Sequence, residues 1–341
     1  MAKVKVAVLG TGSLGQHHAR IYSELHNSGL VEFTGVFDSH AETARKIAEK
    51  NQTRVFNSIA EAAAASDALN IVTPTTTHFE IAKTMLAQGK HVLVEKPMTD
   101  DSVQAAQLIE LAQQKNCVLQ VGHVERFNPV FNFLQTVATE PRFIECHRLS
   151  PYPARSTDIG VVLDLMIHDL DIVLAFVKSP VTSVDAVGIP VLSKSEDIAN
   201  VRLRFGNNCV ANLTASRISP ERMRKIRVFS GPTNPCYISL DYRVQEGFIY
   251  RVARDGEEES SLLKKVLAAK LGLDSTIVSK FAGKKIVREP VPIAKDEPLK
   301  LELQHFVECV RAQQTPMVSG ESAKRALDLA FEITRQIQQI K

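Results

Sequence analysis

The fold is decided by residues 4–15, which read Val4-Lys5-Val6-Ala7-Val8-Leu9-Gly10-Thr11-Gly12-Ser13-Leu14-Gly15. A short apolar strand runs directly into a G-x-G-x-x-G loop, and a helix is expected to start at its end. Gly10 suits the tight turn, Gly12 lets a pyrophosphate approach the backbone, and Gly15 lets the helix pack on the strand. The N–H groups of Ser13, Leu14 and Gly15 at the helix start favour an anionic phosphate. The stretch predicts a dinucleotide-binding loop.

An acidic residue, Asp38, closes the second expected strand about twenty residues after the loop, where such a motif needs it. Its carboxylate can accept hydrogen bonds from the adenosine ribose of NAD. A 2′-phosphate would instead meet a like charge, at about 4 kcal/mol per charge pair at ~4 Å and an effective dielectric of about 20. NAD is therefore predicted in preference to NADP. A cap for the helix expected from about His40 to Lys50 is a compatible second role for Asp38.

Strands and helices alternate through the first 120 or so residues, and most of the strands are continuous apolar runs. The pattern includes a short strand at 54–56 and a helix from His78 to Ala87. This predicts a doubly wound parallel sheet in the order 3-2-1-4-5-6 with helices on both faces, an α/β fold. From about residue 142 to 250 the segments alternate apolar with polar residues, which is typical of an antiparallel sheet, and a hairpin turn is expected at 206–208. We expect a nucleotide-binding domain over 1–122 and a substrate-binding and oligomerisation domain over 123–341, ending in helices at 299–312 and 322–340.

The composition narrows the class of protein. The chain has 341 residues, enough for two domains, and 41 basic against 38 acidic residues give no case for nucleic-acid binding. Its five cysteines are scattered without metal-ligand spacing, which indicates reduced thiols in a cytoplasmic protein and no metal site. No apolar run is long enough to span a membrane, and no signal peptide is expected.

Two motifs carry candidate chemistry at strand ends and loops. Glu95-Lys96-Pro97 follows an apolar strand, so Lys96 could point an ammonium into the crevice at the carboxyl ends of the strands, although a surface lysine beside a loop proline is an equal alternative. Thr73, Pro74 and His78 lie near the glycine loop and, with Glu95 and Lys96, could flank the cofactor, although capping and packing are alternative roles for the first three.

A third candidate is the segment 161–174, which reads as a helix that is apolar nearly all round and therefore buried. Asp164, His168 and Asp171 are spaced i, i+4, i+7 and share one face of this helix. Unpaired charges are costly to bury, so these groups must be paired or must line a wet cleft. A core histidine bonded to Asp164 is the structural alternative.

A fourth candidate is the stretch Gly122–Pro129, which leads from the first domain into the second. Its Arg126 and Asn128 could face substrate, or the stretch could be a solvated linker with Asn128 capping a helix at Pro129.

Together, the glycine loop, Glu95-Lys96-Pro97 and the Asp164-x-x-x-His168 helix resemble the Gfo/Idh/MocA oxidoreductases over essentially the whole chain. The resemblance implies a Rossmann domain, then an α/β domain with a large open, mostly antiparallel sheet through which homodimers or homotetramers form. It implies oxidation of a sugar or cyclitol hydroxyl by NAD(P), with Lys96, Asp164 and His168 as the catalytic group.

The chemistry of these side chains suggests their roles. A neutral His168 can take the hydroxyl proton, Asp164 can orient the imidazole, and Lys96 can stabilise the developing alkoxide. The residues leave open whether Lys96 or His168 is the primary base.

The substrate expectation also rests on resemblance. Gly122–Pro129 and Pro97-Met98-Thr99 look most like a family branch that oxidises the C3 hydroxyl of UDP-N-acetylglucosamine. Arg148 and Arg155 could meet its diphosphate, because arginine binds phosphate bidentately. The alternatives are a free sugar or a cyclitol such as inositol as substrate, and a non-catalytic NAD-binding regulator.

One stretch departs from this pattern. Residues 255–295 look like a basic insertion, and within it residues 262–288 combine an apolar stripe with lysines that could touch anionic lipid or a partner. A solvated insertion packed on its own subunit or a neighbour is the alternative.

Overall fold

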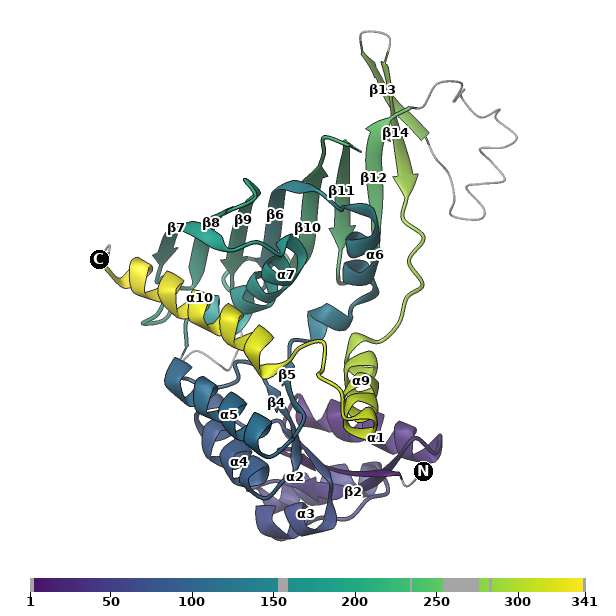
Figure 1. Cartoon of the computed structure of the whole chain (residues 1–341), viewed down its shortest axis with the longest axis vertical. Helices are drawn as coiled ribbons and strands as arrows, with labels where there is room; N and C mark the ends of the chain where they lie inside the picture. The colour runs from purple at the N-terminus through teal and green to yellow at the C-terminus, as the bar shows by residue number, and fades with distance from the viewer. Residues whose placement is uncertain (1–2, 153–158, 234, 254–275, 282–283, 340–341) are drawn as a thin grey trace. The chain divides into compact units, whose positions relative to one another are not determined.

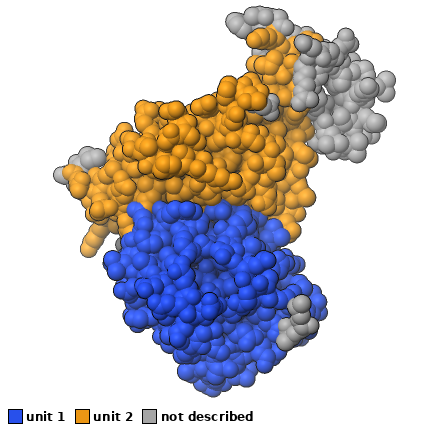
Figure 2. Space-filling view, viewed as in Figure 1, with its two compact units in different colours: residues 1–127, 297–328 blue, residues 128–296, 329–341 orange. Residues whose placement is uncertain are grey.

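The computed structural model describes residues 3–152, 159–233, 235–253, 276–281 and 284–339, with the side chains left out over 276–281. The chain divides into two compact units, which Figure 2 colours separately. Unit 1 comprises residues 1–127 and 297–328, and unit 2 comprises residues 128–296 and 329–341. The division differs from the expected 1–122 and 123–341 because the chain returns to unit 1 near its end.

Unit 1 is built on a five-stranded sheet in the order β2-β1-β3-β4-β5, and every pairing in it is parallel (Figure 1). The strand expected at residues 54–56 is reduced to a single parallel bridge between Val36 and Val55. With that bridge counted as the third strand, the predicted doubly wound order is confirmed. The strands are β1 (Val4–Leu9), β2 (Val31–Phe37), β3 (Ala68–Ile71), β4 (His91–Glu95) and β5 (Leu119–Gly122).

Local sequence fixes where several helices of unit 1 begin. The Ser58 hydroxyl accepts the amide of Glu61 at 3.1 Å before α3, and Asp101 accepts the amide of Gln104 at 3.1 Å before α5. Helix α4 begins at Thr75, three residues before the expected start at His78. The helices are α1 (Gly15–Asn27), α2 (Ala41–Lys50), α3 (Ile59–Ala65), α4 (Thr75–Ala87) and α5 (Ser102–Gln114).

The helix predicted near 299–312 is α9 (Pro298–Ala312), and it packs in the core of unit 1. Its Leu303 and Phe306 are fully buried in one cluster with Val6 of β1 and Ile21 of α1. Full burial of such a side chain contributes roughly 1.5–3 kcal/mol. This apolar face is why α9 belongs to the nucleotide-binding unit and not to the second domain.

Unit 2 contains a nine-stranded sheet in the order β13-β14-β12-β11-β10-β6-β9-β8-β7. Every pairing is antiparallel except β6 with β9, so the prediction of an open, mostly antiparallel sheet is confirmed. The turn expected at 206–208 joins β8 to β9, with Asn208 at φ 64°. The strands are β6 (Pro141–Leu149), β7 (Val181–Ile189), β8 (Ile198–Phe205), β9 (Val210–Ser216), β10 (Met223–Ser230), β11 (Cys236–Asp241), β12 (Glu246–Val252), β13 (Thr276–Phe281) and β14 (Lys284–Pro290).

The two faces of this sheet differ. Alternate residues of β8, namely Ala199, Val201 and Leu203, are fully buried. Figure 1 shows helix α7 (Ile167–Val177) lying across the sheet, with α6 (Pro129–Val137) nearby. A row of aromatic rings crosses four neighbouring strands with centroids 5.4, 4.7 and 5.2 Å apart; it consists of Phe143, Phe229, Tyr237 and Tyr250.

The helix predicted over 322–340 is α10 (Gly320–Gln339). It begins in unit 1 and ends in unit 2, because the division between the units falls within it at residue 328. Its Ala326, Ala330 and Ile333 are fully buried.

The expected insertion at 255–295 is described only in part. Strands β13 and β14 extend the sheet beyond β12, so the end of this segment is sheet. The apolar stripe, from Leu262 to Leu273 in the sequence, lies outside the described residues. Among the helices that the structure describes, none is long and apolar enough to cross a membrane.

Candidate active site

The glycine loop has the geometry that its sequence predicts. Gly10 has φ +93°, and a Cβ there would lie 2.3 Å from the carbonyl oxygen of Val72. A Cβ on Gly15 would lie 1.9 Å from the carbonyl oxygen of Gly10, so helix α1 approaches the loop too closely for any side chain. Among the described residues, a Cβ on Gly12 would meet no atom beyond its chain neighbours within 4 Å. Gly10 and Gly15 therefore serve the fold, while Gly12 keeps the outer surface of the loop open.

The start of α1 is available to an anion. Gly12, Ser13 and Leu14 are exposed, and no side chain of the described residues caps the helix at Leu14. The backbone N–H groups of a first helical turn need acceptors, and a phosphate can supply them.

Asp38 lies at the end of β2, beside this loop. Its Oδ2 accepts the Thr11 amide at 2.6 Å and the Thr11 hydroxyl at 2.9 Å, and its Oδ1 accepts the His40 amide at 2.9 Å. Burial by itself raises the pKa of Asp38, but the hydrogen bonds from His40 and Thr11 outweigh burial and lower the pKa below its ordinary value. The carboxylate is thus ionised and fixed in place, which fits a ribose diol and disfavours a 2′-phosphate. The predicted capping role is not observed, because the N-cap of α2 is His40 and Asp38 accepts the amide of that residue, before the helix begins.

The expected cofactor residues differ in burial: Pro74 is exposed, Thr73 is half-buried and His78 is buried. His78 is 1% exposed, and its two ring nitrogens lie 2.9 Å from the carbonyl oxygen of Thr73 and 3.0 Å from that of Pro97. Burial lowers the pKa of His78, although the hydrogen bonds to these two carbonyls act to raise it. His78 therefore joins the β3–α4 turn to the turn after β4. The structure favours packing for His78 over direct contact with the cofactor.

Lys96 lies in the turn directly after β4 and is half-buried. The peptide bond that joins it to Pro97 is cis. The carboxylate of Glu95 points back into unit 1, where its Oε1 lies 3.3 Å from Nε2 of the fully buried His18. A Cβ on Gly122 would lie 2.7 Å from the same carboxylate. Glu95 is therefore held between the helix that follows the glycine loop and strand β5, and it fixes the backbone that carries Lys96.

A buried chain of hydrogen bonds extends this contact. The Tyr22 hydroxyl donates to Oδ1 of Asn70 at 3.0 Å, so the Asn70 amide nitrogen faces Nδ1 of His18, also at 3.0 Å. With Nδ1 as acceptor, the imidazole of His18 carries its proton on Nε2, towards Glu95. Sequence reasoning missed Asn70 and Tyr22, because a polar residue in an apolar strand has no partner identifiable by spacing.

These contacts show that unit 1 fits NAD. An open glycine, an uncapped helix start and a fixed ionised carboxylate match the pyrophosphate and the ribose diol of that cofactor. Gly10, Gly12, Ser13, Leu14, Gly15 and Asp38 would hold it.

In unit 2 the predicted helix over 161–174 is present, but its first part is wound differently. Residues Val162–Met166 form a π-helical turn that continues into α7. Asp164 and His168 are half-buried, whereas Asp171 is 3% exposed. π-helical turns are rare and are frequent at functional sites, which supports Asp164 and His168 as candidates.

Arg148 does not have the phosphate-binding role that the sequence suggests for it. Its Nε and Nη2 donate to the two carboxylate oxygens of Asp169, each at 2.9 Å, and its side chain is 4% exposed. The guanidinium is used inside unit 2 to tie β6 to α7. Arg155 lies outside the described residues.

Arg126 and Asn128 are also used structurally. Arg126 lies in the 3-10 turn Val124–Phe127, is 7% exposed, and its Nη2 lies 3.4 Å from the carbonyl oxygen of Met317. Asn128 is 3% exposed, and it caps α6 by accepting the Val130 amide at 3.1 Å while donating to the Tyr242 carbonyl at 3.1 Å. The capping alternative for Asn128 is therefore correct, and these contacts give neither residue an open approach to a substrate.

Two further features bear on the chemistry of the chain. Within the described ranges, no group of three or more His, Cys, Asp or Glu side chains is arranged to hold a metal ion.

A buried ion pair, Asp197 with Arg217, lies next to the start of the helix that carries Asp164 and His168. No sequence pattern singles it out, because a separation of twenty residues matches no helix or strand period.

Comparisons with known proteins agree with this geometry. Residues 4–123 match the family described as "Oxidoreductase family, NAD-binding Rossmann fold", and residues 138–230 match the GFO/IDH/MocA C-terminal domain. A UDP-N-acetylglucosamine 3-dehydrogenase from Acidithiobacillus ferrooxidans is 33% identical over 98% of this chain and 97% of its own length. A scyllo-inositol 2-dehydrogenase (NAD(+)) from Bacillus subtilis is 26% identical over 98% of this chain and 94% of its own length.

Solved structures also resemble this chain, among them one of the same UDP-N-acetylglucosamine 3-dehydrogenase activity. The structure of UDP-N-acetylglucosamine 3-dehydrogenase GnnA from Acidithiobacillus ferrooxidans superposes with a TM-score of 0.86 at 32% identity, covering 99% of both chains. GenD2 from gentamicin A biosynthesis, solved in complex with NAD, shares the fold at a TM-score of 0.75 and 18% identity, over 99% of this chain and 94% of its own. The prediction of an NAD-dependent enzyme is confirmed, and the chain belongs to the Gfo/Idh/MocA family of NAD-binding oxidoreductases.

Proposed function

We propose that this protein oxidises the C3 hydroxyl of UDP-N-acetylglucosamine to a ketone, with NAD as the oxidant. The observation that carries the proposal is the likeness, along nearly the whole of both chains, to a UDP-N-acetylglucosamine 3-dehydrogenase. The Lys96 motif and the Asp164–His168 pair add support, because both are present in this chain on the elements that the family resemblance requires.

The roles of the residues follow from the reaction. Oxidation of a secondary alcohol removes a proton from oxygen and a hydride from carbon, and NAD, when bound, would supply the hydride acceptor at nicotinamide C4. A neutral His168 imidazole takes the proton, and Asp164, one turn earlier, orients the ring and stabilises the imidazolium. Lys96 donates a hydrogen bond to the same oxygen and stabilises its developing negative charge.

The test uses the purified protein with NAD and a panel of UDP-N-acetylglucosamine, UDP-glucose, scyllo-inositol and myo-inositol. NADH formation is followed by absorbance. We expect saturable turnover with UDP-N-acetylglucosamine and little with the others. UDP-N-acetylglucosamine deuterated at C3 should transfer its deuterium to NADH, and transfer of none would exclude oxidation at C3.

Two variants test the catalytic assignment. Lys96→Ala and His168→Ala should each lose roughly 100-fold or more of kcat, which is within the range for a general acid–base group. Both should still bind NAD, measured by the fluorescence of bound NADH. A near-normal kcat in either variant would remove that residue from the mechanism.

A second candidate is a cyclitol dehydrogenase, favoured by the likeness to scyllo-inositol 2-dehydrogenase over 98% of this chain. Turnover of an inositol with no turnover of nucleotide sugars would establish it. NAD binding without turnover of any member of the panel would instead support a regulator.

The assembly belongs to the same proposal. We expect a homodimer or homotetramer formed through the sheet of unit 2, because its aromatic row includes Phe229, which is 39% exposed. Light scattering at several concentrations measures the subunit number, and a monomer at all of them would exclude this interface.

A cytoplasmic location is consistent with five free cysteines, including the buried thiol of Cys146.

A further inference from the structure

A buried carboxylate organises the loop between β7 and β8. Asp197 is fully buried, and its Oδ2 accepts the backbone amides of Val191, Leu192 and Ser193 at 2.8, 2.6 and 2.9 Å. Burial by itself would raise the pKa of Asp197, but the amide of Leu192 and the guanidinium of Arg217 hold that pKa far below its ordinary value. The carboxylate is therefore ionised, and it fixes residues 191–197 as one rigid turn.

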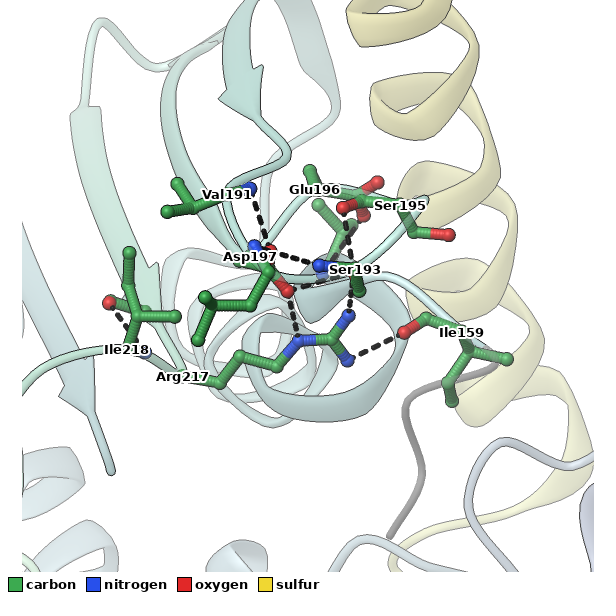
Figure 3. A network of polar contacts seen from close by, with 11 residues as sticks. Ile159, Val191, Ser193, Ser195, Glu196, Asp197, Arg217 and Ile218 are labelled. Atoms are coloured by element: carbon green, nitrogen blue, oxygen red, sulfur yellow. Dashed lines mark hydrogen bonds and ion pairs between the residues drawn. The ribbon is translucent and has the colours of Figure 1, made fainter. Parts of the chain in front are cut away.

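Arg217 connects that turn to a distant part of the chain (Figure 3). The side chain is fully buried just after β9, and its Nε donates to Oδ1 of Asp197 at 2.7 Å. Its Nη2 donates to the hydroxyl of Ser193 at 2.8 Å, and its Nη1 donates to the carbonyl oxygen of Ile159 at 2.7 Å. Ile159 is two residues before the helix that carries Asp164 and His168.

The neighbour of Asp197 holds the other side of the same helix start. The carbonyl oxygen of Glu196 accepts the amide of Val161 at 2.9 Å, and its Oε1 lies 3.3 Å from the amide of Val162. These are N–H groups of the first turn, which have no acceptor within a helix. A Cβ on Gly160 would lie 1.9 Å from Oε1 of Glu196, so only glycine lets the carboxylate approach.

Residues 159–162 are thus held on both sides by two consecutive loop residues. Asp197 binds Arg217, which donates to the carbonyl oxygen of Ile159 before the helix. Glu196 accepts the amides of Val161 and Val162 at the helix start. The π-helical turn begins at Val162, the last of these contacts, and contains Asp164. A helix whose first turn is anchored in this way has its rotation and its rise fixed at that end.

From this geometry we propose that Glu196 and Arg217 are positioning residues, which act on the reaction through the helix that carries Asp164 and His168. The proposal rests on the proposed function of that helix. A displacement of about 1 Å in a reacting group can cost roughly 100-fold in rate, so small shifts at residues 159–162 should be visible in kcat.

The test compares variants that remove one contact each. Glu196→Ala loses the acceptor for Val162, Glu196→Asp shortens its reach, and Glu196→Gln keeps an oxygen at the right place. Arg217→Lys keeps the charge but replaces the fork that contacts Asp197, Ser193 and Ile159. The matched control is Arg251→Lys, which alters an ion pair with Glu289 between β12 and β14 of the same unit.

Kinetics are measured at a temperature where each variant is folded, and kcat is expressed per NAD-binding site. Glu196→Ala and Arg217→Lys should lose roughly 10- to 100-fold of kcat, with an altered pH profile of kcat/KM and unchanged NAD affinity. Glu196→Asp should be intermediate, and Glu196→Gln should recover most of the rate. A role in stability alone would lower the number of folded sites without moving the pH profile. Rates and profiles equal to those of Arg251→Lys would overturn the proposal.

A second measurement separates this proposal from the proposed function. The titration of His168 is followed by NMR in histidine-labelled protein without substrate, and the His168 signal is assigned from its absence in His168→Gln. The titration curve should change in Glu196→Ala or Glu196→Asp and should not change in Arg251→Lys. If the wild type turns over no sugar or cyclitol, the proposed function fails while this titration still decides the positioning role. Identical curves in all variants would reject that role.

Discussion

Arg148 and Asp169 form a two-pronged ion pair inside unit 2, with both hydrogen bonds at 2.9 Å and side chains 4% and 8% exposed. The pair joins strand β6 to the first turn of α7, at the residue that follows His168. Such planar pairs are strong and directional, so this contact fixes α7 at a second point, after the helix start.

Breaking this pair on one side should be costly. Arg148→Met leaves the buried carboxylate of Asp169 without its partner, and we expect a loss of about 3–5 kcal/mol in the free energy of unfolding. The double variant Arg148→Met with Asp169→Leu should recover part of that loss, because no charge stays buried. Urea unfolding followed by circular dichroism measures both. A double variant less stable than Arg148→Met would contradict this account.

The glycine loop allows binding to be separated from folding. Gly12→Ala adds a methyl group that meets no atom within 4 Å in the part of the chain that the structure describes, apart from its chain neighbours, so the melting temperature should stay unchanged. The same methyl should obstruct a pyrophosphate and raise the Kd for NAD by roughly tenfold or more, equal to about 1.4 kcal/mol. Calorimetric titration with NAD measures this.

Gly15→Ala is the matched control for that variant. Its methyl would lie 1.9 Å from the carbonyl oxygen of Gly10, so it should lower the melting temperature. A stable Gly15→Ala or an unstable Gly12→Ala would show that the loop is not built as described.

Asp38 should set the choice of cofactor. Asp38→Ser removes the ionised carboxylate while keeping a hydroxyl that can bond to ribose. We expect weaker NAD binding and stronger NADP binding, with the ratio of the two Kd values changing roughly 10- to 100-fold, which corresponds to about 1.4–2.8 kcal/mol. Competition of both cofactors against bound NADH gives the ratio, and an unchanged ratio would mean that Asp38 only organises Thr11 and His40.

His91 should make stability fall in mild acid. Its Nδ1 accepts the amide of Val118 at 2.9 Å, and burial lowers the pKa of His91. Because the folded-state pKa lies below the unfolded value of about 6.5, the unfolded state binds more protons, and stability is lost as the pH falls from about 6.5. Urea midpoints between pH 7.5 and about 5 should therefore fall less steeply in His91→Gln, whose amide oxygen can accept the same bond without titrating. Equal slopes in the two proteins would show that His91 is not the group responsible.

Much of unit 1 could be predicted from the sequence, because its evidence is local. The glycine loop depends on residues a few positions apart, and Asp38 follows it at the spacing of about twenty residues that such a motif needs. The start of α4 was missed by three residues, since Thr75–Thr77 carry no apolar pattern to mark it. The strand at 54–56 was reduced to a bridge for tertiary reasons that its sequence does not carry.

The polar contacts of unit 2 could not be predicted in the same way. The sequence offered Arg148 as a phosphate ligand, but only the fold shows that Asp169 occupies its guanidinium. Asn128 has the features of a helix cap and of a ligand residue alike, and the structure makes it a cap. Glu196 and Arg217 carry no pattern at all, because their partners lie on other strands and loops.

The path of the chain through α9 has a practical consequence for dissecting the protein. Because residues 297–328 return to unit 1, no single cut yields that unit as one continuous piece. A fragment ending at residue 127 would lack Leu303 and Phe306 and would expose the apolar surface that they cover on β1 and α1. Recombinant production of an isolated nucleotide-binding half would require fusing residues 297–328 through an artificial linker, and domain-shuffling experiments would have to exchange two segments together.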